Sequence, residues 1–308
     1  AVEHQVRIAC RVEPCKLTKD GRPSVSGIPG GLAPKGYGVD GMEFWGRLSF
    51  LKSALVFTDV LTTVSPRYAQ EIQYPPLSCG LEGVLRFRRE DLVGIINGVD
   101  YDEWSPQSDR YIENHFSADD LTGKEGNKQA LLESLGMPYR AGVPVIGIVS
   151  RLASQKGFDL VGSVMPALLQ RHGFQLVVLG SGEPALEDMF QHLQRSFPRQ
   201  VCFYRGFHNQ LAHQIEAGSD MFLMPSRYEP CGLNQLYSLR YGTVPIVHRV
   251  GGLADTVRPW NPNTGAGTGF AFEHHDAAGL RWAIQAALRT YRDADQWHQL
   301  VQNGMSED

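Results

Sequence analysis

Residues 221–247 read MFLMPSRYEPCGLNQLYSLRYGTVPIV and contain an apolar run, a turn, a helical pattern and a second apolar run. Met221–Met224 and Val244–Val247 are short and apolar enough to be buried strands. Between them, apolar residues recur at helical spacing from Leu233 to Arg240. Two short apolar strands joined by a helix predict parallel strands and a right-handed crossover.

The same alternation fills the second half of the chain. Further strands are predicted at Val143–Val149, Phe174–Leu179 and Val201–Tyr204, with helical patterns between them. Two more amphipathic helices are predicted at Ala277–Leu288 and Asp293–Met305. This half therefore predicts an α/β fold with a doubly wound parallel sheet, in which ligands bind at the carboxyl ends of the strands.

The first half carries a weaker pattern. Residues 1–38 show no pattern that predicts an element. The spacing from Phe44 to Leu55 predicts a helix, and Val60–Val64 and Leu92–Ile96 predict strands. Residues 100–128 are polar and rich in turn formers, which suggests a linker and a domain boundary near residue 140.

Composition limits the functional classes. The 308 residues suffice for two domains, and a net charge of −4 argues against a nucleic-acid or anionic membrane partner. No apolar run is long enough for a transmembrane helix. Five cysteines without a CxxC pair and ten histidines without metal-ligand spacing predict reduced thiols, a cytoplasmic or plastid location and no metal site.

Two cations follow the strand Val143–Val149. Arg151 and Lys156 lie between the end of this strand and the start of a helix, where backbone N–H groups and the helix dipole favour phosphate. Arginine grips phosphate oxygens bidentately, and lysine adds a mobile charge. The alternative interpretation is two solvated surface cations.

Glycine-containing turns follow three other strands. Gly206 allows close backbone approach, and Phe207 is either a cover for a nucleobase or a core aromatic. Gly251-Gly252 forms one more such turn. Gly180-Ser181-Gly182 resembles part of a dinucleotide fingerprint, but Ala185 replaces the third glycine, so NAD binding is disfavoured.

The turn after Met221–Met224 contains Glu229 between a strand end and a helix start. Read alone, it is also compatible with a surface loop and a solvated Glu229. Together, however, four strand ends should line one crevice, because parallel strands end at the same edge of a sheet. The combined residues predict a site for a phosphate-bearing ligand with a polar, sugar-like part.

Four stretches carry a resemblance to a known family: LTTVSPRYAQEI (residues 61–72), IINGVDYDEWSP (95–106), SRLASQKGFDL (150–160) and PSRYEPCGLNQLYSLRYGTVPIVHRVGGLADTV (225–257). In this order they closely resemble the bacterial glycogen synthase and plant starch synthase family, over roughly residues 38–308. Tyr237 stands where related transferases carry a second glutamate, which fits starch and glycogen synthases.

The resemblance implies a GT-B fold, in which two Rossmann-like domains with parallel sheets enclose the active site. Residues 38–139 would form the last part of the acceptor-side domain with a linker, and residues 140–308 the nucleotide-sugar domain. Residues 1–37 stay unassigned. The implied activity is transfer of glucose from ADP-glucose to the non-reducing end of an α-1,4-glucan, with retention and without a cofactor or metal.

The resemblance also implies roles for single residues. Arg151 and Lys156 match the pair that holds the ADP pyrophosphate, and Glu229 matches the acidic residue beside the donor glucose. The remaining matches are to nucleotide-sugar-binding positions: Gly206, Phe207, Cys231, Gly232, Leu233 and Asn234. For Cys231, a small buried thiol is the alternative to a chemical role.

The chain departs from the family at its start. The family's Lys-x-Gly-Gly-Leu turn is absent, and Pro29–Leu32 lacks its lysine. The sequence is therefore expected to be a fragment with an incomplete N-terminal domain. Two alternatives remain open: a non-catalytic nucleotide- or glucan-binding remnant, and another GT-B nucleotide-sugar transferase.

Overall fold

The computed structural model describes residues 6–9 and 41–307. The chain divides into two compact units, residues 1–96 and 97–308. Three features from the sequence, Pro29–Leu32, Cys10 and Cys15, lie outside the described residues.

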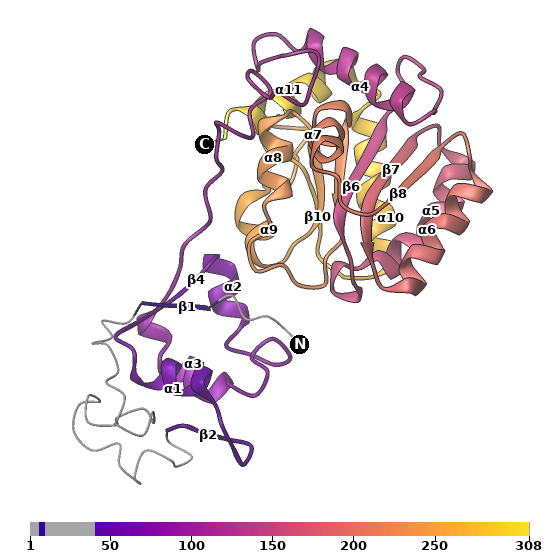
Figure 1. Ribbon diagram of the computed structural model, residues 1–308. Coiled ribbons are helices and arrows are strands. Elements are labelled where there is room, and N and C mark those ends of the chain that lie inside the picture. Colours follow the sequence, from indigo (N-terminus) through magenta and orange to yellow (C-terminus); the bar gives the residue numbers. More distant parts are fainter. Residues whose placement is uncertain (1–5, 10–40, 308) are drawn as a thin grey trace, which may run out of the picture. The chain divides into compact units, whose positions relative to one another are not determined.

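The first unit contains a three-stranded sheet in the order β1–β4–β5, formed by Val6–Ala9, Val60–Thr63 and Leu92–Gly94 (Figure 1). β4 pairs antiparallel with β1 and parallel with β5. The helical elements are α1 (Phe50–Phe57), α2 (Pro66–Glu71), α3 (Glu82–Phe87) and η3 (Arg89–Asp91). Leu55, Leu61 and Tyr68 are among the residues of its small core.

The helix expected from Phe44 begins later, at Phe50. Residues 43–48 instead form the two-stranded hairpin β2 (Glu43–Phe44) and β3 (Arg47–Leu48). Ser49 then caps α1, because its side-chain oxygen accepts a hydrogen bond of 3.1 Å from the backbone N–H of Lys52.

The second unit is built on a six-stranded parallel sheet in the order β11–β10–β9–β6–β7–β8. Its strands are β6 (Val145–Leu152), β7 (Gln175–Gly182), β8 (Val201–Arg205), β9 (Met221–Met224), β10 (Val244–His248) and β11 (Phe270–Phe272). The order reverses between β6 and β9, as a doubly wound sheet requires. The predicted parallel α/β sheet is confirmed.

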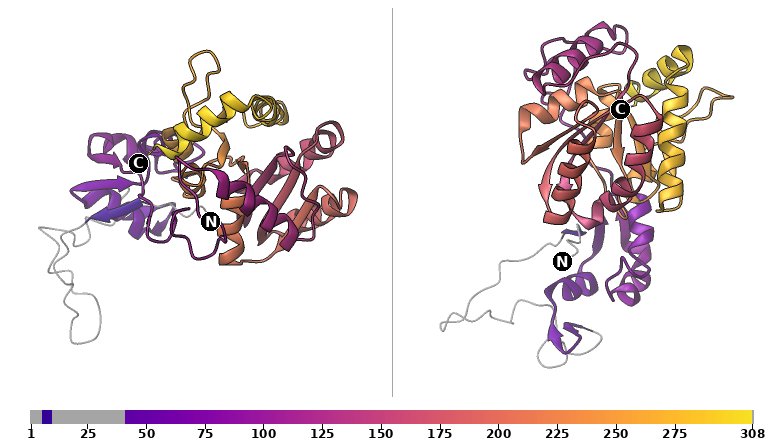
Figure 2. Two further views of the ribbon diagram at one scale, coloured as in Figure 1. Left: turned by 90° about the horizontal axis from the view of Figure 1, so that it is seen from above. Right: turned by 90° about the vertical axis from the view of Figure 1, so that its right-hand side faces the viewer.

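Helices cover both faces of this sheet (Figures 1 and 2). They are α4 (Thr122–Ser134), α5 (Phe158–Arg171), α6 (Pro184–Ser196), α7 (Asn209–Gly218), α8 (Asn234–Arg240), α9 (Gly251–Thr256), α10 (Ala277–Thr290) and α11 (Ala294–Met305). Successive residues of β6 point to opposite faces of the sheet. Ile146 and Ile148 join the core under α5, α6 and α10, whereas Val145 joins the core under α4 and α7.

The unit begins at Asn97, so residues expected to form a linker pack within it. Trp104 stacks between the rings of His213 and Tyr237, with centroid distances of 3.7 and 3.9 Å. The buried Asp109 carboxylate accepts hydrogen bonds from His213 at 2.8 Å and Tyr241 at 2.6 Å. These contacts fix the segment before β6 to α7 and α8.

No helix within the described part of the chain is long and apolar enough to span a membrane.

Candidate active site

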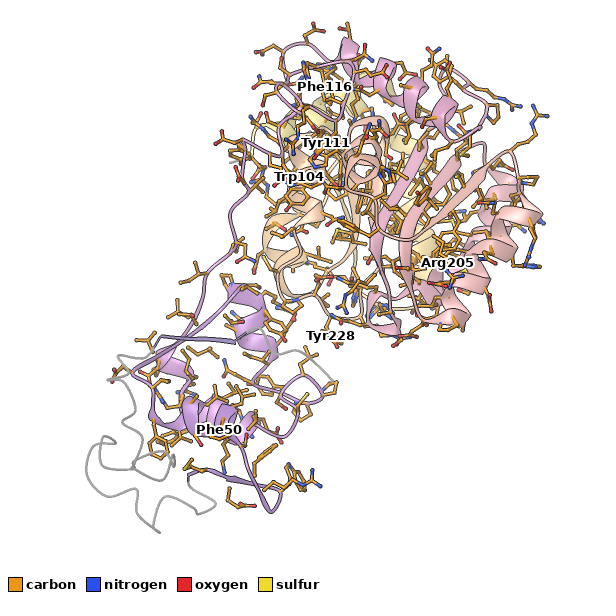
Figure 3. All side chains as sticks on the ribbon, viewed as in Figure 1. Phe50, Trp104, Tyr111, Phe116, Arg205 and Tyr228 are labelled. Atoms are coloured by element: carbon orange, nitrogen blue, oxygen red, sulfur yellow. The ribbon has the colours of Figure 1, made fainter. Side chains whose placement is uncertain are left out.

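The predicted site residues lie at or after the carboxyl ends of strands β6, β8 and β9. β6 runs into the short helix η4 (Ser154–Lys156) and then α5, while β9 runs into the turn 225–233 and then α8. β6 and β9 are adjacent in the sheet. Arg205, the last residue of β8, and Tyr228, which follows β9, lie toward the same edge of the unit in Figure 3.

Lys156 and Glu229 meet at this edge. The Lys156 Nζ lies 2.6 Å from the Glu229 Oε2, and the Ser226 hydroxyl donates to the same oxygen at 2.9 Å. The Glu229 side chain is only 8% exposed and that of Lys156 19%. The surface-loop interpretation is therefore wrong, because Glu229 is a buried, paired carboxylate.

Two hydrogen bonds join the segments that carry this pair. The Arg227 backbone N–H donates to the Gln155 carbonyl at 2.9 Å, and the Gln155 side-chain amide donates to the Tyr228 carbonyl at 3.3 Å. Gly157 has a φ of +72°, and a Cβ at that position would collide with the Pro225 carbonyl oxygen. Only glycine therefore allows the loops after β6 and β9 to lie this close.

Gly251 and Gly252, which follow β10, contact the backbone of the turn that carries Glu229. Gly251 has a φ of +44°, and a Cβ there would collide with the Glu229 carbonyl oxygen. The Gly252 N–H donates to this oxygen at 3.1 Å. The predicted turn is the first part of the short helix α9, whose start lies against the backbone of Glu229.

β6 extends to Leu152, so Arg151 lies within the strand rather than after it as expected; it pairs with Ser181 of β7 and is exposed. Within residues 6–9 and 41–307, no hydrogen bond or ion pair engages its guanidinium group. A free, exposed guanidinium is available to an anion. Its role in binding phosphate stays a prediction.

The residues after Glu229 shape the start of α8. Cys231 is 3% exposed, and burial raises the pKa of its thiol, which favours a small buried thiol over a chemical role. The Asn234 amide donates to the Val149 carbonyl at 3.0 Å, which ties α8 to β6. Gly232 adopts a φ of +75°, and Leu233 precedes the helix with 37% exposure.

Phe207 is not a core aromatic, because it is 83% exposed. Gly206 precedes it with a φ of +131°, and its N–H donates to the Gly180 carbonyl at 3.0 Å. The exposed ring thus follows the end of β8. Binding of a base by Phe207 stays a prediction.

Gly180 and Gly182 do not form a dinucleotide loop. Both lie inside β7, and a Cβ at either position would collide with the backbone of β6 at Ser150 or Leu152. These glycines therefore serve the close packing of two strands.

Several residues that hold the turn were not predicted. The buried Gln235 side chain donates to the Cys231 and Gly232 carbonyls at 3.0 and 3.1 Å. Ser226 was missed too, although a hydroxyl three residues before a buried carboxylate was a usable local signal. Among the residues that the structure describes, no group of three His, Cys, Asp or Glu side chains is arranged to hold a metal ion.

Two family models match the sequence. The model "Glycosyl transferases group 1" covers residues 139–304, and the model "Starch synthase catalytic domain" covers residues 23–87. The first match contains both Lys156 and Glu229.

Curated relatives give the same result. The glycogen synthase of Koribacter versatilis is 52% identical over 267 residues, which is 87% of this chain and 55% of that protein. The glycogen synthase of Anaeromyxobacter dehalogenans is 52% identical over 269 residues, or 87% of this chain and 56% of that protein. The chain thus spans about half the length of these relatives.

Among solved structures, the catalytic domain of starch synthase IV from Arabidopsis thaliana, bound to ADP and acarbose, is 35% identical with a TM-score of 0.83. The match covers 89% of this chain and 58% of that one. Together with the parallel sheet, it confirms the predicted GT-B type α/β fold. The chain therefore belongs to the group 1 glycosyl transferases and, within them, to the glycogen synthase and starch synthase family.

Proposed function

We propose that the unit of residues 97–308 binds ADP-glucose at the carboxyl edge of its sheet. The observation that carries the proposal is the pair of Lys156 and Glu229, 2.6 Å apart after adjacent strands. A cation and a carboxylate at one point suit a ligand with a diphosphate next to a sugar. The starch synthase IV relative was solved with ADP, which supports ADP as the nucleotide.

The proposed reaction moves glucose from ADP-glucose to the non-reducing end of an α-1,4-glucan, with retention at the anomeric carbon. The residues before 97, part of which match the starch synthase catalytic model, are assigned to the acceptor. Residues 97–308, the second unit, are assigned to the donor.

Charge changes during bond cleavage define the residue roles. As the glycosidic bond to phosphate breaks, positive charge develops on the sugar and negative charge on the departing diphosphate. Arg151 and Lys156 stabilise the diphosphate, and such fixed cations stabilise the transition state more than the ground state. The Glu229 carboxylate favours the positive charge on the sugar.

Lys156 has a second role in this proposal. Because its ammonium group has three donors, it can hold Glu229 with one and a diphosphate oxygen with another. It thereby separates two like charges that would otherwise repel each other. The exposed ring of Phe207, with Gly206 before it, is assigned to the adenine.

The test is a glucan-extension assay with ADP-glucose and UDP-glucose side by side. Elongation of an α-1,4-glucan primer is expected with ADP-glucose, and Lys156→Ala should lower its rate. Preferred use of UDP-glucose would contradict the proposed donor. Binding of ADP without any transfer would instead favour a non-catalytic nucleotide-binding chain.

A further inference from the structure

Two histidines hold consecutive carbonyl groups at the start of the Glu229 turn. His248, the last residue of β10, lies with Nδ1 2.7 Å from the Ser226 carbonyl oxygen. His275, which follows β11, lies with Nε2 2.8 Å from the Pro225 carbonyl oxygen. Since a carbonyl only accepts, the hydrogen sits on Nδ1 of His248 and on Nε2 of His275.

Both rings are fixed by their surroundings. His248 is 6% exposed and stacks on Phe272 with a centroid distance of 5.2 Å. The ring of His275 meets that of His248 edge-on at 5.0 Å. The Nε2 of His275 also lies 2.7 Å from the point where a Cβ of Gly157 would stand, so the ring fills the space beside this glycine.

Ser226 connects the histidines to Glu229. Its carbonyl accepts from His248, and its hydroxyl donates to the Glu229 Oε2 at 2.9 Å. That oxygen is also the partner of Lys156. A shift of the Ser226 peptide therefore moves the carboxylate and changes its ion pair.

We propose that His248 and His275 are positioning residues that orient Glu229 for glucosyl transfer. This inference rests on the proposed function. Loss of either donor leaves a peptide carbonyl without its partner and lets the turn relax. A misplacement of about 1 Å at a reacting group can cost as much as a hundredfold in rate.

The chemistry of the two rings allows matched substitutions. An asparagine amide places its NH₂ group near the position of a histidine Nδ1, and a glutamine amide near that of Nε2. His248→Asn and His275→Gln therefore keep the donor, whereas His248→Gln and His275→Asn displace it. All four variants remove the imidazole, so the loss of the ring is common to them.

Two measurements are made on the full chain and the four variants. The first is the carboxyl ¹³C resonance of Glu229, which reports its contacts with Lys156 and Ser226 whether or not glucose is transferred. The second separates kcat from KM for ADP-glucose in the glucan-extension assay. Calorimetry with ADP and thermal unfolding show that each variant is folded and binds nucleotide.

The donor-keeping variants are expected to retain the Glu229 resonance and a kcat within about threefold of the parent. The donor-displacing variants should shift the resonance and lower kcat at least roughly tenfold, with little change in KM. An unmoved resonance in all four variants would overturn the positioning role. If the Glu229 resonance follows the predicted pattern but the parent chain transfers no glucose, the positioning role is upheld and the proposed function is contradicted.

Discussion

Two lysine–carboxylate pairs lie at opposite ends of strand β6. After its carboxyl end, Lys156 meets Glu229 at 2.6 Å, and the two side chains are 19% and 8% exposed. At its start, Lys128 of α4 meets Asp220 at 2.9 Å with exposures of 2% and 11%. The Asp220 carboxylate also accepts from the N–H of Val145, the first residue of β6.

The difference between the pairs lies in their surroundings. Lys128 lies in α4 with only 2% of its side chain exposed, and its ammonium also donates to the Tyr291 hydroxyl at 3.1 Å. Burial lowers the pKa of Lys128, but the Asp220 carboxylate, Tyr291 and Glu125 together outweigh this effect and raise it overall. Lys156 is the last residue of the short helix η4, and its side chain is 19% exposed. The carboxylates are similarly buried and the lysines differ, so the pair anchors a helix where its lysine is enclosed and forms a candidate site where its lysine stays partly exposed.

The largest effect is expected at the enclosed pair. Lys128→Met leaves the Asp220 charge buried without its cation and should lower the free energy of unfolding by about 3–5 kcal/mol. Asp220→Asn in the same chain should restore part of the loss. Urea unfolding measures the loss in Lys128→Met and the recovery in the double variant. The control is Arg171→Met at the exposed end of α5, which should cost less than about 0.5 kcal/mol. A cost as small as that control would show that the enclosed pair does not anchor α4.

The accessible pair should respond in turnover. Glu229→Gln keeps the shape but removes the charge that favours the developing positive charge on the sugar. We expect kcat to fall by at least roughly a hundredfold, about 2.7 kcal/mol, and ADP affinity to stay within about threefold. Steady-state kinetics and calorimetry test this, with Asp188→Asn on the exposed face of α6 as control. Loss of ADP binding together with turnover would point instead to a collapsed turn.

A smaller effect concerns pH. Burial raises the pKa of Glu216, in α7, from its ordinary value to about 8, so the folded state holds a proton that the unfolded state has lost. Stability from this group should therefore fall as the pH rises from about 6 to about 7, by about 1 kcal/mol.

Burial also lowers the pKa of Lys124 to about 7, which makes stability rise with pH above that value. The variant Glu216→Gln isolates the contribution of Glu216, because a glutamine side chain does not titrate. Urea unfolding at about pH 6 and about pH 7 should show that the free energy of unfolding decreases less for the variant than for the parent. Equal decreases in both chains would contradict a raised pKa for Glu216.

Five of the six strands of the second unit could be predicted because they are short apolar runs, and four of them (β6, β7, β9 and β10) are largely buried in the sheet. The sixth strand, β11, was not predicted, since it has only three residues. The helix α4 could not be predicted, since its buried positions include Asn127 and Lys128 beside Leu131 and Leu132. Polar side chains at buried positions conceal an amphipathic pattern, and a polar stretch then resembles a linker. Their partners, such as Asp220, lie far away in the sequence.

In the candidate site, too, local sequence features could be predicted and contacts between distant residues could not. That Lys156 and Glu229 follow strand ends is visible in the sequence, and the parallel sheet brings those ends to one edge. The supports from His248 and His275 depend on contacts across 22 and 50 residues, which no local pattern specifies. The sequence therefore predicted the groups at the site better than the contacts that orient them.

The central claim is that the cations at the carboxyl end of β6 hold a diphosphate, and calorimetric titration with ADP tests it most directly. Each of Arg151→Ala and Lys156→Ala should weaken ADP binding by roughly tenfold to a hundredfold, because each removes a charge-assisted contact of about 1.5–3 kcal/mol. Arg171→Ala, which removes the same charge at the far end of α5, should leave the affinity unchanged. Equal ADP affinity in the parent and both site variants, or no binding up to about millimolar ADP, would contradict the account.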